Sequence, residues 1–301
     1  MIVTVTLNPA VDKTCKAGRL IQGEVNRMRE VKSEAGGKGI NVTKILRQFH
    51  LPVAAIGFLG GYSGRMIEER MMKLGAECHF TRTKGDTRIN MNIMSDDGYV
   101  TELLEPGPVI SEKELFNFRK EFEYCMEQCD LMVFSGSIPQ GVPMDIYAQL
   151  IEVCKREGIR TVLDTSGEAL KEGIKARPYM IKPNKRELEY LVGKRLDSKE
   201  AIVCEAGRLV REGIGKVIVS LGEQGLLYVD SVQSIFEEAK KVKAVNTVGC
   251  GDSVVASLCM SEVSGEAADI AMKKASALAA ANATTEGSAD IVMSTYLDLL
   301  D

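Results

Sequence analysis

Short apolar runs alternate with longer helical patterns along most of this chain. Several runs are too continuously apolar to leave one face in water, which favours a parallel sheet covered on both sides. We therefore predict an α/β fold, a central, mostly parallel sheet flanked by helices on both faces. Strands are expected at residues 2–7, 53–58, 131–135, 161–164, 179–182 and 216–220. Helices are expected at residues 41–48, 64–74, 112–129, 144–157, 187–192, 253–263 and 267–284.

Two segments, residues 12–35 and 86–105, depart from this alternation. They hold alternating, partly charged stretches at residues 25–31, 88–94 and 99–104, with no crossover helix nearby. We predict that they form a small antiparallel sheet that projects from the main domain as a lid. Because the segments come from separate places in the sequence, the sheet is expected to be an insertion in a single domain spanning residues 1–301.

Composition and charge exclude several classes of protein. The net charge of −4 is spread along the chain, unlike the basic patch of a nucleic-acid-binding protein or the polybasic anchor of a membrane-bound one. The N-terminal apolar run turns polar by Asn8, so it reads as a strand rather than a signal peptide. No apolar stretch reaches the roughly 18 residues of a membrane span.

The eight cysteines contain no Cys-x-x-Cys pair, and His50 and His79 are the only histidines, so zinc-site spacing is absent. We expect reduced thiols and a cytoplasmic location.

The informative segment is residues 245–253, with the sequence VNTVGCGDS. Gly249 and Gly251 permit a tight turn with outward N–H groups, and a helix is expected to begin at Ser253. Such a helix N-terminus binds phosphoryl groups. Asp252 would repel a phosphate there, so we interpret it as the base for a sugar hydroxyl that attacks the γ-phosphorus of ATP. The alternative is an Asp that merely caps the helix.

This segment resembles the anion-hole motif of the ribokinase-like (phosphofructokinase B) carbohydrate kinases. Further motifs of that family follow in order along nearly the whole chain. They are TLNPAVD at residues 6–12, GGKGINV at 36–42, GFLGG at 57–61, SGSIP at 135–139, KPNKRE at 182–187 and SLGEQG at 220–225. The resemblance implies a ribokinase-like fold with a β-sheet lid, ATP and Mg²⁺ as cofactors, and a homodimer formed through the lid.

The resemblance also implies which residues bind the sugar phosphate. Asp12 and Asn41 are expected to form hydrogen bonds to sugar hydroxyls, and Gly37 is expected to bring the backbone close to the sugar. We assign Lys38 and Arg88, with Arg27 as a weaker third cation, to the phosphate of the substrate. Ser137 is expected to support the sugar or its phosphate. For Asp12 the alternative is a turn-forming role, and for the cations it is an ordinary solvated surface position.

For catalysis, the amides of Gly249, Cys250 and Gly251 are expected to stabilise the transferring phosphoryl group beside Asp252. Residues expected to bind ATP are Lys182, Asn184, Ser220, Leu221, Gly222, Glu223, Gly225 and Gly251. Asp164 and Glu187 resemble the family's acidic pair near magnesium, acting through water. Glu187 is alternatively an ordinary first-turn helix residue. Cys250 stands where the family has Ala or Ser, and a thiol beside a helix N-terminus can have a lowered pKa and become reactive.

Other short stretches of sequence bear on which sugar phosphate is the substrate. Residues 85–90, 166–170 and 248–256 look most like 1-phosphofructokinases, whereas residues 101–108 also resemble tagatose-6-phosphate kinases. We favour conversion of fructose 1-phosphate to fructose 1,6-bisphosphate. The alternatives are tagatose 6-phosphate phosphorylation and a non-catalytic sugar-phosphate-binding protein. A dinucleotide-dependent oxidoreductase and a P-loop kinase are disfavoured, because neither G-x-G-x-x-G after the first strand nor G-x-x-x-x-G-K-[ST] occurs.

Overall fold

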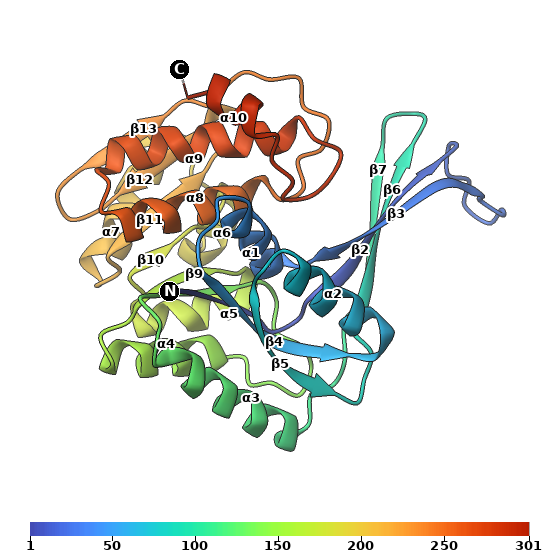
Figure 1. The fold of residues 1–301 in the computed structure, drawn as a ribbon. Helices are drawn as coiled ribbons and strands as arrows, with labels where there is room; N and C mark the ends of the chain where they lie inside the picture. The colour runs from blue at the N-terminus through green and yellow to red at the C-terminus, as the bar shows by residue number, and fades with distance from the viewer. Residues whose placement is uncertain (301) are drawn as a thin grey trace.

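Two sheets organise the chain in the computed structural model, which describes residues 1–300 (Figure 1). The strands of the larger sheet, in their spatial order, are β13 (Ser234–Glu237), β12 (Leu226–Val229), β11 (Lys216–Ser220), β10 (Met180–Ile181), β9 (Arg160–Asp164), β8 (Leu131–Ser135), β1 (Ile2–Thr6), β4 (Val53–Gly60) and β5 (Glu77–Thr83). All are parallel except β12 and β13, which extend one edge as antiparallel strands. The predicted mostly parallel sheet is confirmed.

Successive side chains of a strand point to opposite faces, and here both faces are apolar. In β1, Val3 and Val5 join one buried cluster, while Ile2 joins another on the opposite face. Helices cover the two faces accordingly (Figure 1). The first face carries α3 (Glu112–Met126), α4 (Ile146–Arg156), α5 (Gly167–Gly173), α6 (Lys185–Val192) and α7 (Lys199–Arg211). The second carries α1 (Lys38–Gln48), α2 (Gly61–Lys73), α8 (Cys250–Ser264), α9 (Ala268–Ala283) and α10 (Met293–Asp298).

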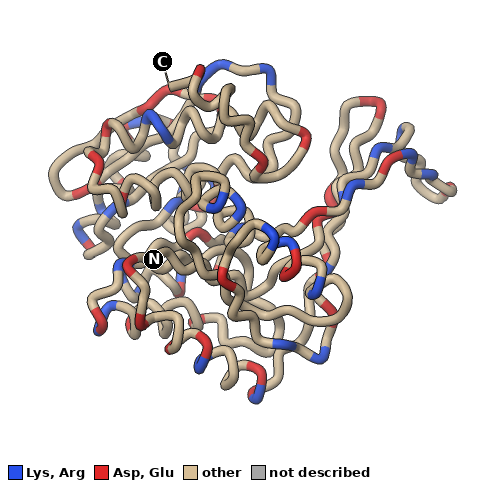
Figure 2. The backbone as a smooth tube through the Cα atoms, viewed as in Figure 1, with Lys and Arg blue, Asp and Glu red and all other residues tan. Residues whose placement is uncertain are grey.

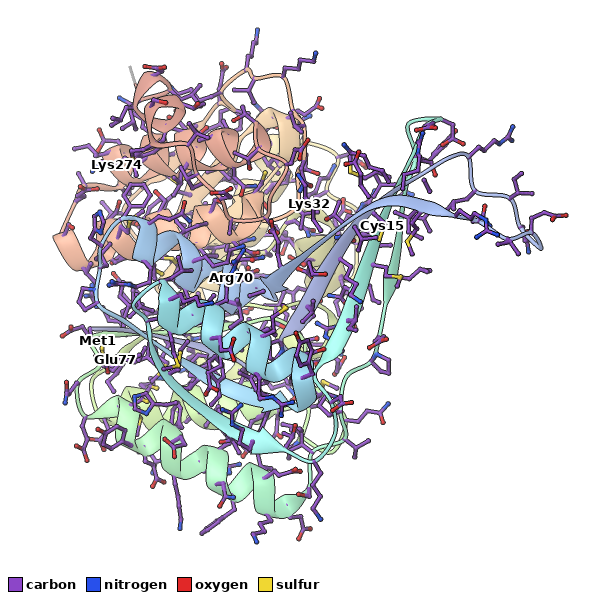
Figure 3. The ribbon with its side chains drawn as sticks, turned by 45° about the vertical axis from the view of Figure 1, so that its right-hand side comes forward. Met1, Cys15, Lys32, Arg70, Glu77 and Lys274 are labelled. Carbon is purple, nitrogen blue, oxygen red and sulfur yellow. The ribbon has the colours of Figure 1, made fainter. Side chains whose placement is uncertain are left out.

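The smaller sheet projects from the body of the molecule (Figures 1 and 3). Its order is β3-β2-β6-β7, formed by β3 (Met28–Gly36), β2 (Ala10–Ala17), β6 (Arg88–Ser95) and β7 (Val100–Leu104). The two outer pairs are antiparallel as predicted, but the central pair, β2 with β6, is parallel. Both strands leave the larger sheet in the same direction, which the local pattern of either strand could not reveal. We call this sheet the lid.

Lysine and arginine are interspersed with aspartate and glutamate along the backbone, as the colours of Figure 2 show. Among residues 1–300, no helix combines the length and the apolar character that spanning a membrane would require.

Candidate active site

A cavity of about 590 Å³ lies at the carboxyl ends of the parallel strands, beneath the base of the lid. Ligands of open α/β sheets bind at this edge, because loops from several strands converge there. The strand order reverses at β1, which pairs with β4 on one side and β8 on the other. The lining residues are Asn8, Asp12, Gly37, Lys38, Asn41, Arg88, Asn90, Leu104, Gly136, Ser137, Asp164, Thr165, Ser166, Lys182, Asn184, Glu187, Ser220, Val248, Gly249, Gly251 and Asp252.

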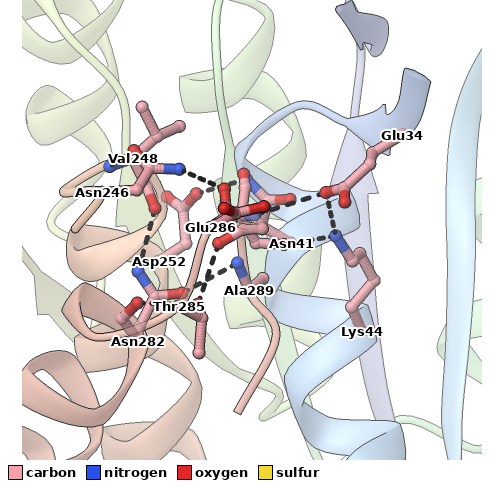
Figure 4. Close-up of polar contacts among 12 residues, drawn as sticks. Glu34, Asn41, Lys44, Asn246, Val248, Asp252, Asn282, Thr285, Glu286 and Ala289 are labelled. Carbon is pink, nitrogen blue, oxygen red and sulfur yellow. Dashed lines mark hydrogen bonds and ion pairs between the residues drawn. The ribbon is translucent and has the colours of Figure 1, made fainter. Parts of the chain in front are cut away.

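Asp252 lies in this cavity, within the first turn of α8. The helix begins at Cys250, three residues before the predicted start, because Gly249 adopts a left-handed φ of 85° and serves as the N-cap. Asp252 therefore is not the cap, and that alternative is wrong. Its Oδ2 instead accepts a hydrogen bond of 2.8 Å from Asn41 Nδ2 on α1 (Figure 4).

Burial determines the acidity of Asp252. The residue is only 6% exposed, and burial together with the nearby charge of Asp164 raises its pKa to about 6. Lys38, the Asn41 hydrogen bond and Lys182 act in the opposite direction, so they limit this rise. A carboxylate with a pKa close to the working pH is suited to accept a proton in catalysis.

Main-chain amides surround the start of α8. No hydrogen bond among residues 1–300 uses the N–H groups of Gly249, Gly251 or Asp252, as expected of a first helical turn. The amide of Cys250 differs, because it donates to the Thr247 carbonyl at 3.3 Å. The thiol of Cys250 is largely buried, and burial raises its pKa. The activated thiolate considered for Cys250 is therefore not supported.

Asp164, at the end of β9, holds two lysines. Its Oδ1 lies 3.1 Å from Lys38 Nζ and 3.5 Å from Lys182 Nζ. Burial alone would raise the pKa of Asp164, but the two ammonium groups lower it. Burial alone would lower the pKa of Lys38, but the neighbouring carboxylates raise it. Asp164 Oδ2 is buried and has no hydrogen-bond partner among the described residues. The site thus carries two cations and one open carboxylate oxygen.

Asp12 and Arg88 lie together at the base of the lid. The parallel β2–β6 register places Asp12 opposite Asn90, whose Nδ2 donates to Asp12 Oδ1 at 2.9 Å. Gly36 is needed beside them, because a Cβ there would lie 1.9 Å from Asp12 Oδ2. Arg88 donates to the carbonyls of Asn8 and Glu105 at 3.0–3.2 Å, which fixes its guanidinium at the cavity. Burial raises the pKa of Asp12.

Two side-chain hydrogen bonds hold the turn after β8. Gly136 adopts a φ of 99°, and its carbonyl accepts hydrogen bonds from Tyr147 Oη at 3.0 Å and Thr165 Oγ1 at 2.8 Å. Ser137, next in the chain, accepts a 3.2 Å hydrogen bond from Asn8 Nδ2. The turn therefore presents Ser137 to the cavity from a rigid support.

Asn184 and Glu187 form a capping box at the start of α6. Asn184 Oδ1 accepts from the Glu187 amide at 2.9 Å, and Glu187 Oε2 accepts from the Asn184 amide at 2.8 Å. The first-turn role considered for Glu187 is thus real, and the residue still lines the cavity.

The structure gathers most of the predicted residues but not all. Those absent from the cavity lining are Arg27, Cys250, Leu221, Gly222, Glu223 and Gly225. Arg27 is exposed in the connection between β2 and β3, and the last four belong to the turn after Ser220. Asn8, Asn90, Thr165 and Ser166 line the cavity without having been predicted. Asn8 stands within the TLNPAVD motif, but the contact of Asn90 with Asp12 joins positions 78 residues apart.

Comparisons with known proteins agree with this geometry. The model of the pfkB family carbohydrate kinases matches residues 3–295. A 1-phosphofructokinase of Bacillus subtilis (strain 168) is 39% identical over 256 residues, which cover 85% of this chain and 84% of that protein. Phosphofructokinase-2 from Escherichia coli, solved with potassium, superimposes with a TM-score of 0.92 at 28% identity, covering 99% of this chain and 97% of the other.

Arabidopsis thaliana ribokinase, solved with ribose and ATP, matches at 21% identity and a TM-score of 0.80, covering 100% of this chain and 98% of the other, so it shares the fold. The predicted ribokinase-like architecture is therefore confirmed, and the chain belongs to the pfkB family of carbohydrate kinases.

Proposed function

We propose that the protein phosphorylates fructose 1-phosphate to fructose 1,6-bisphosphate, with Asp252 as the general base. Family membership already makes it an ATP-dependent sugar-phosphate kinase. The observation that carries the proposal is a buried carboxylate, with a pKa raised to about 6, in the helix turn whose amides at Gly249 and Gly251 make no hydrogen bond within residues 1–300. An ordinary first-turn acid is stabilised by the helix dipole, but a buried acid with a raised pKa that lines a cavity is typical of a functional site.

In the proposed mechanism, Asp252 accepts the proton of the attacking sugar hydroxyl. The hydroxyl oxygen forms a bond to the γ-phosphorus while the bond from that phosphorus to the β–γ bridging oxygen breaks, releasing ADP. Asn41 holds Oδ2 of Asp252, which leaves Oδ1 for the substrate. The amides of Gly249 and Gly251 stabilise the negative charge on the transferring phosphoryl oxygens.

Different lining residues of the cavity are assigned to the sugar phosphate and to ATP. We propose that Asp12, Asn41, Gly37 and Ser137 bind the sugar, and that Arg88 and Lys38 bind its phosphate. Arg88 is suited to this because two of its five N–H donors remain after its three bonds to carbonyls. Lys182, Asn184 and Ser220, which also line the cavity, are proposed to bind the phosphates of ATP.

The donor set fits Mg²⁺. Asp164 and Glu187 both line the cavity, and the open Oδ2 of Asp164 is a suitable acceptor for a magnesium-bound water. When bound, the ion would neutralise charge on the nucleotide phosphates. Lys38 and Lys182 keep Asp164 ionised, so it can serve this role at neutral pH.

The test of substrate is a coupled assay of ADP release with fructose 1-phosphate, tagatose 6-phosphate and fructose 6-phosphate. We expect the highest kcat/KM with fructose 1-phosphate. A preference for tagatose 6-phosphate would favour the alternative kinase, whose chemistry is the same. Binding of a sugar phosphate without turnover of ATP would instead identify a non-catalytic binding protein and contradict the proposal.

Activity is expected to fall in acid with a midpoint near pH 6. The base must be ionised, and Asp252 becomes protonated as pH drops through its pKa of about 6. A plot of log kcat/KM against pH should therefore be flat above this value and fall with unit slope below it. Thermal unfolding at pH 5 serves as the control that the protein remains folded. A profile that stays flat down to pH 5 would contradict the assignment of Asp252.

We also propose a homodimer formed through the lid. The lid and its connections expose several apolar side chains, including Val25 at 81% and Tyr99 at 74%. Apolar exposure on a projecting sheet is typical of a surface that pairs with another chain. Sedimentation at micromolar concentration is expected to show a dimer. The Tyr99→Lys variant should shift this equilibrium toward the monomer. The matched surface change Tyr62→Lys on α2 should leave the dimer unchanged. A wild-type monomer would refute the pairing. The cytoplasm remains our proposed compartment, as predicted from the cysteine spacing.

A further inference from the structure

A buried asparagine on α9 lies behind the phosphate-binding turn. Asn282 is fully buried, and its side chain makes hydrogen bonds both to the segment that leads into α8 and to the loop that follows α9 (Figure 4). Its Nδ2 donates to the Val248 carbonyl at 2.9 Å and lies 3.4 Å from Cys250 Sγ. Its Oδ1 accepts from the Ala289 amide at 2.8 Å. One side chain thus ties together two backbone segments 41 residues apart in the sequence.

The Val248 carbonyl belongs to the same peptide unit as the Gly249 amide. A trans peptide is planar, so its C=O and N–H point in opposite directions. A donor that holds the Val248 oxygen toward α9 therefore turns the Gly249 N–H away from α9. Both residues line the cavity, and no hydrogen bond among residues 1–300 uses the Gly249 N–H.

Gly249 packs closely against Asn282 and Ala289. A Cβ at this position would lie 2.9 Å from the Ala289 nitrogen and 3.4 Å from Asn282 Oδ1, so the bare backbone packs directly on the asparagine and on its second partner. The contact with Cys250 also draws that thiol away from the cavity, which its side chain does not line.

The geometry points to Asn282 as a positioning residue for phosphoryl transfer: through the Val248 carbonyl, it aims the Gly249 N–H at the group being transferred. This inference rests on the proposed kinase reaction and extends it to a residue that does not line the cavity. Losing one oriented donor of this kind costs about 10²–10³ in kcat, and a donor that is misdirected rather than removed should cost about 10- to 100-fold.

Two variants of similar size separate orientation from packing. Asn282→Leu removes both backbone hydrogen bonds, so kcat should fall about 10- to 100-fold while KM for the sugar phosphate changes little. In Asn282→Asp, the buried carboxyl group should be neutral in acid; its O–H then donates to the Val248 carbonyl and its C=O accepts from the Ala289 amide. The kcat of this variant relative to wild type at the same pH should therefore decline as pH rises, and the ratio cancels the titration of Asp252.

The matched control is Ser261→Ala, in which a buried serine at the opposite end of α8 loses its hydrogen bond to Glu266. It should leave kcat unchanged even if the protein is less stable. A folded Asn282→Leu variant with wild-type kcat would overturn the inference. So would an Asn282→Asp variant whose kcat relative to wild type stays constant as pH changes. If the Leu variant does not fold, the Asp variant decides.

A readout without turnover separates this inference from the proposed function. Inorganic phosphate should shift the NMR signal of the Gly249 amide in the wild type, and the Leu variant should need a higher phosphate concentration for the same shift. An unresponsive Gly249 amide in the wild type would overturn the assignment. A wild-type protein that binds phosphate there but phosphorylates none of the three sugars would instead refute only the kinase proposal.

Discussion

Replacing Asp252 by asparagine is expected to lower kcat by at least about 100-fold with little change in substrate binding. A positioned general base contributes about 10²–10⁴ in rate, and the amide of asparagine cannot accept the hydroxyl proton. Asparagine has nearly the same shape, and Asn41 can turn its amide to pair with it, because its own Oδ1 has no partner among the described residues. Steady-state kinetics with ATP and fructose 1-phosphate measure the effect.

The same substitution should not destabilise the fold. Because the folded-state pKa of Asp252 is raised to about 6 from 3.8, the folded protein favours the protonated acid. The resulting cost of ionisation is absent below about pH 4, grows as pH rises toward 6, and amounts to about 3 kcal/mol above that pH. A neutral asparagine avoids this cost, so the midpoint temperature of thermal unfolding of Asp252→Asn at pH 8 should equal or exceed that of the wild type.

The matched control for this variant is Asp269→Asn, the same isosteric change in the first turn of α9, at an exposed position. It should leave kcat unchanged. Wild-type kcat in Asp252→Asn would remove Asp252 from the mechanism. A low kcat combined with a large loss of stability would point to a structural acid instead.

The largest loss of stability is expected from Asp164→Asn. Asp164 and Lys182 are 1% and 4% exposed, and their charges lie 3.5 Å apart in the floor of the cavity. Removing one partner of a buried ion pair leaves the other charge without compensation, which typically costs about 3–5 kcal/mol. The pKa of Asp164 is lowered in the folded state, so its contribution is present above about pH 4 and is lost only in stronger acid. Urea unfolding at pH 7.5 measures it.

Asp164→Asn should also change how kcat/KM depends on pH. The charge of Asp164 is one cause of the raised pKa of Asp252, so removing it should move the acid limb of the kcat/KM profile below pH 6. The control is Glu212→Gln, which breaks an exposed ion pair with Arg208 on α7 and should cost no more than about 0.5 kcal/mol. An acid limb that stays at pH 6 would contradict the coupling of the two carboxylates.

Charged side chains of the lid contact the loop that follows α9, and no local sequence pattern reveals these contacts. Lys32 on β3 points from the lid toward the C-terminal loop, where it pairs with Glu286 (Figure 3). Glu34 on the same strand accepts from the Ser288 amide at 3.3 Å, beside the segment that contacts Asn282 (Figure 4). The chain alternation predicted that a lid exists, but not what it contacts.

Elements with a strong local signal were predictable. The strands at residues 131–135 and 216–220 occur at the predicted positions, because their continuous apolar runs require burial on both faces. The strand β5 was missed, since its sequence ECHFTRT lies at a sheet edge and carries polar side chains. The start of α8 was predicted three residues late, because only the left-handed φ of Gly249 identifies the true cap.

The sequence alone therefore determined the α/β alternation, the projecting lid and the glycine-flanked acid at the head of a helix, because each depends on the periodicity and backbone preferences of neighbouring residues. The tertiary structure decided which distant residues meet. Asn41 contacts Asp252 across 211 residues, where α1 packs against α8, and Lys38 contacts Asp164 across 126, where α1 meets the end of β9. The acidity of Asp252 was likewise decided by the fold, since desolvation and neighbouring charge exist only once the chain is packed around it.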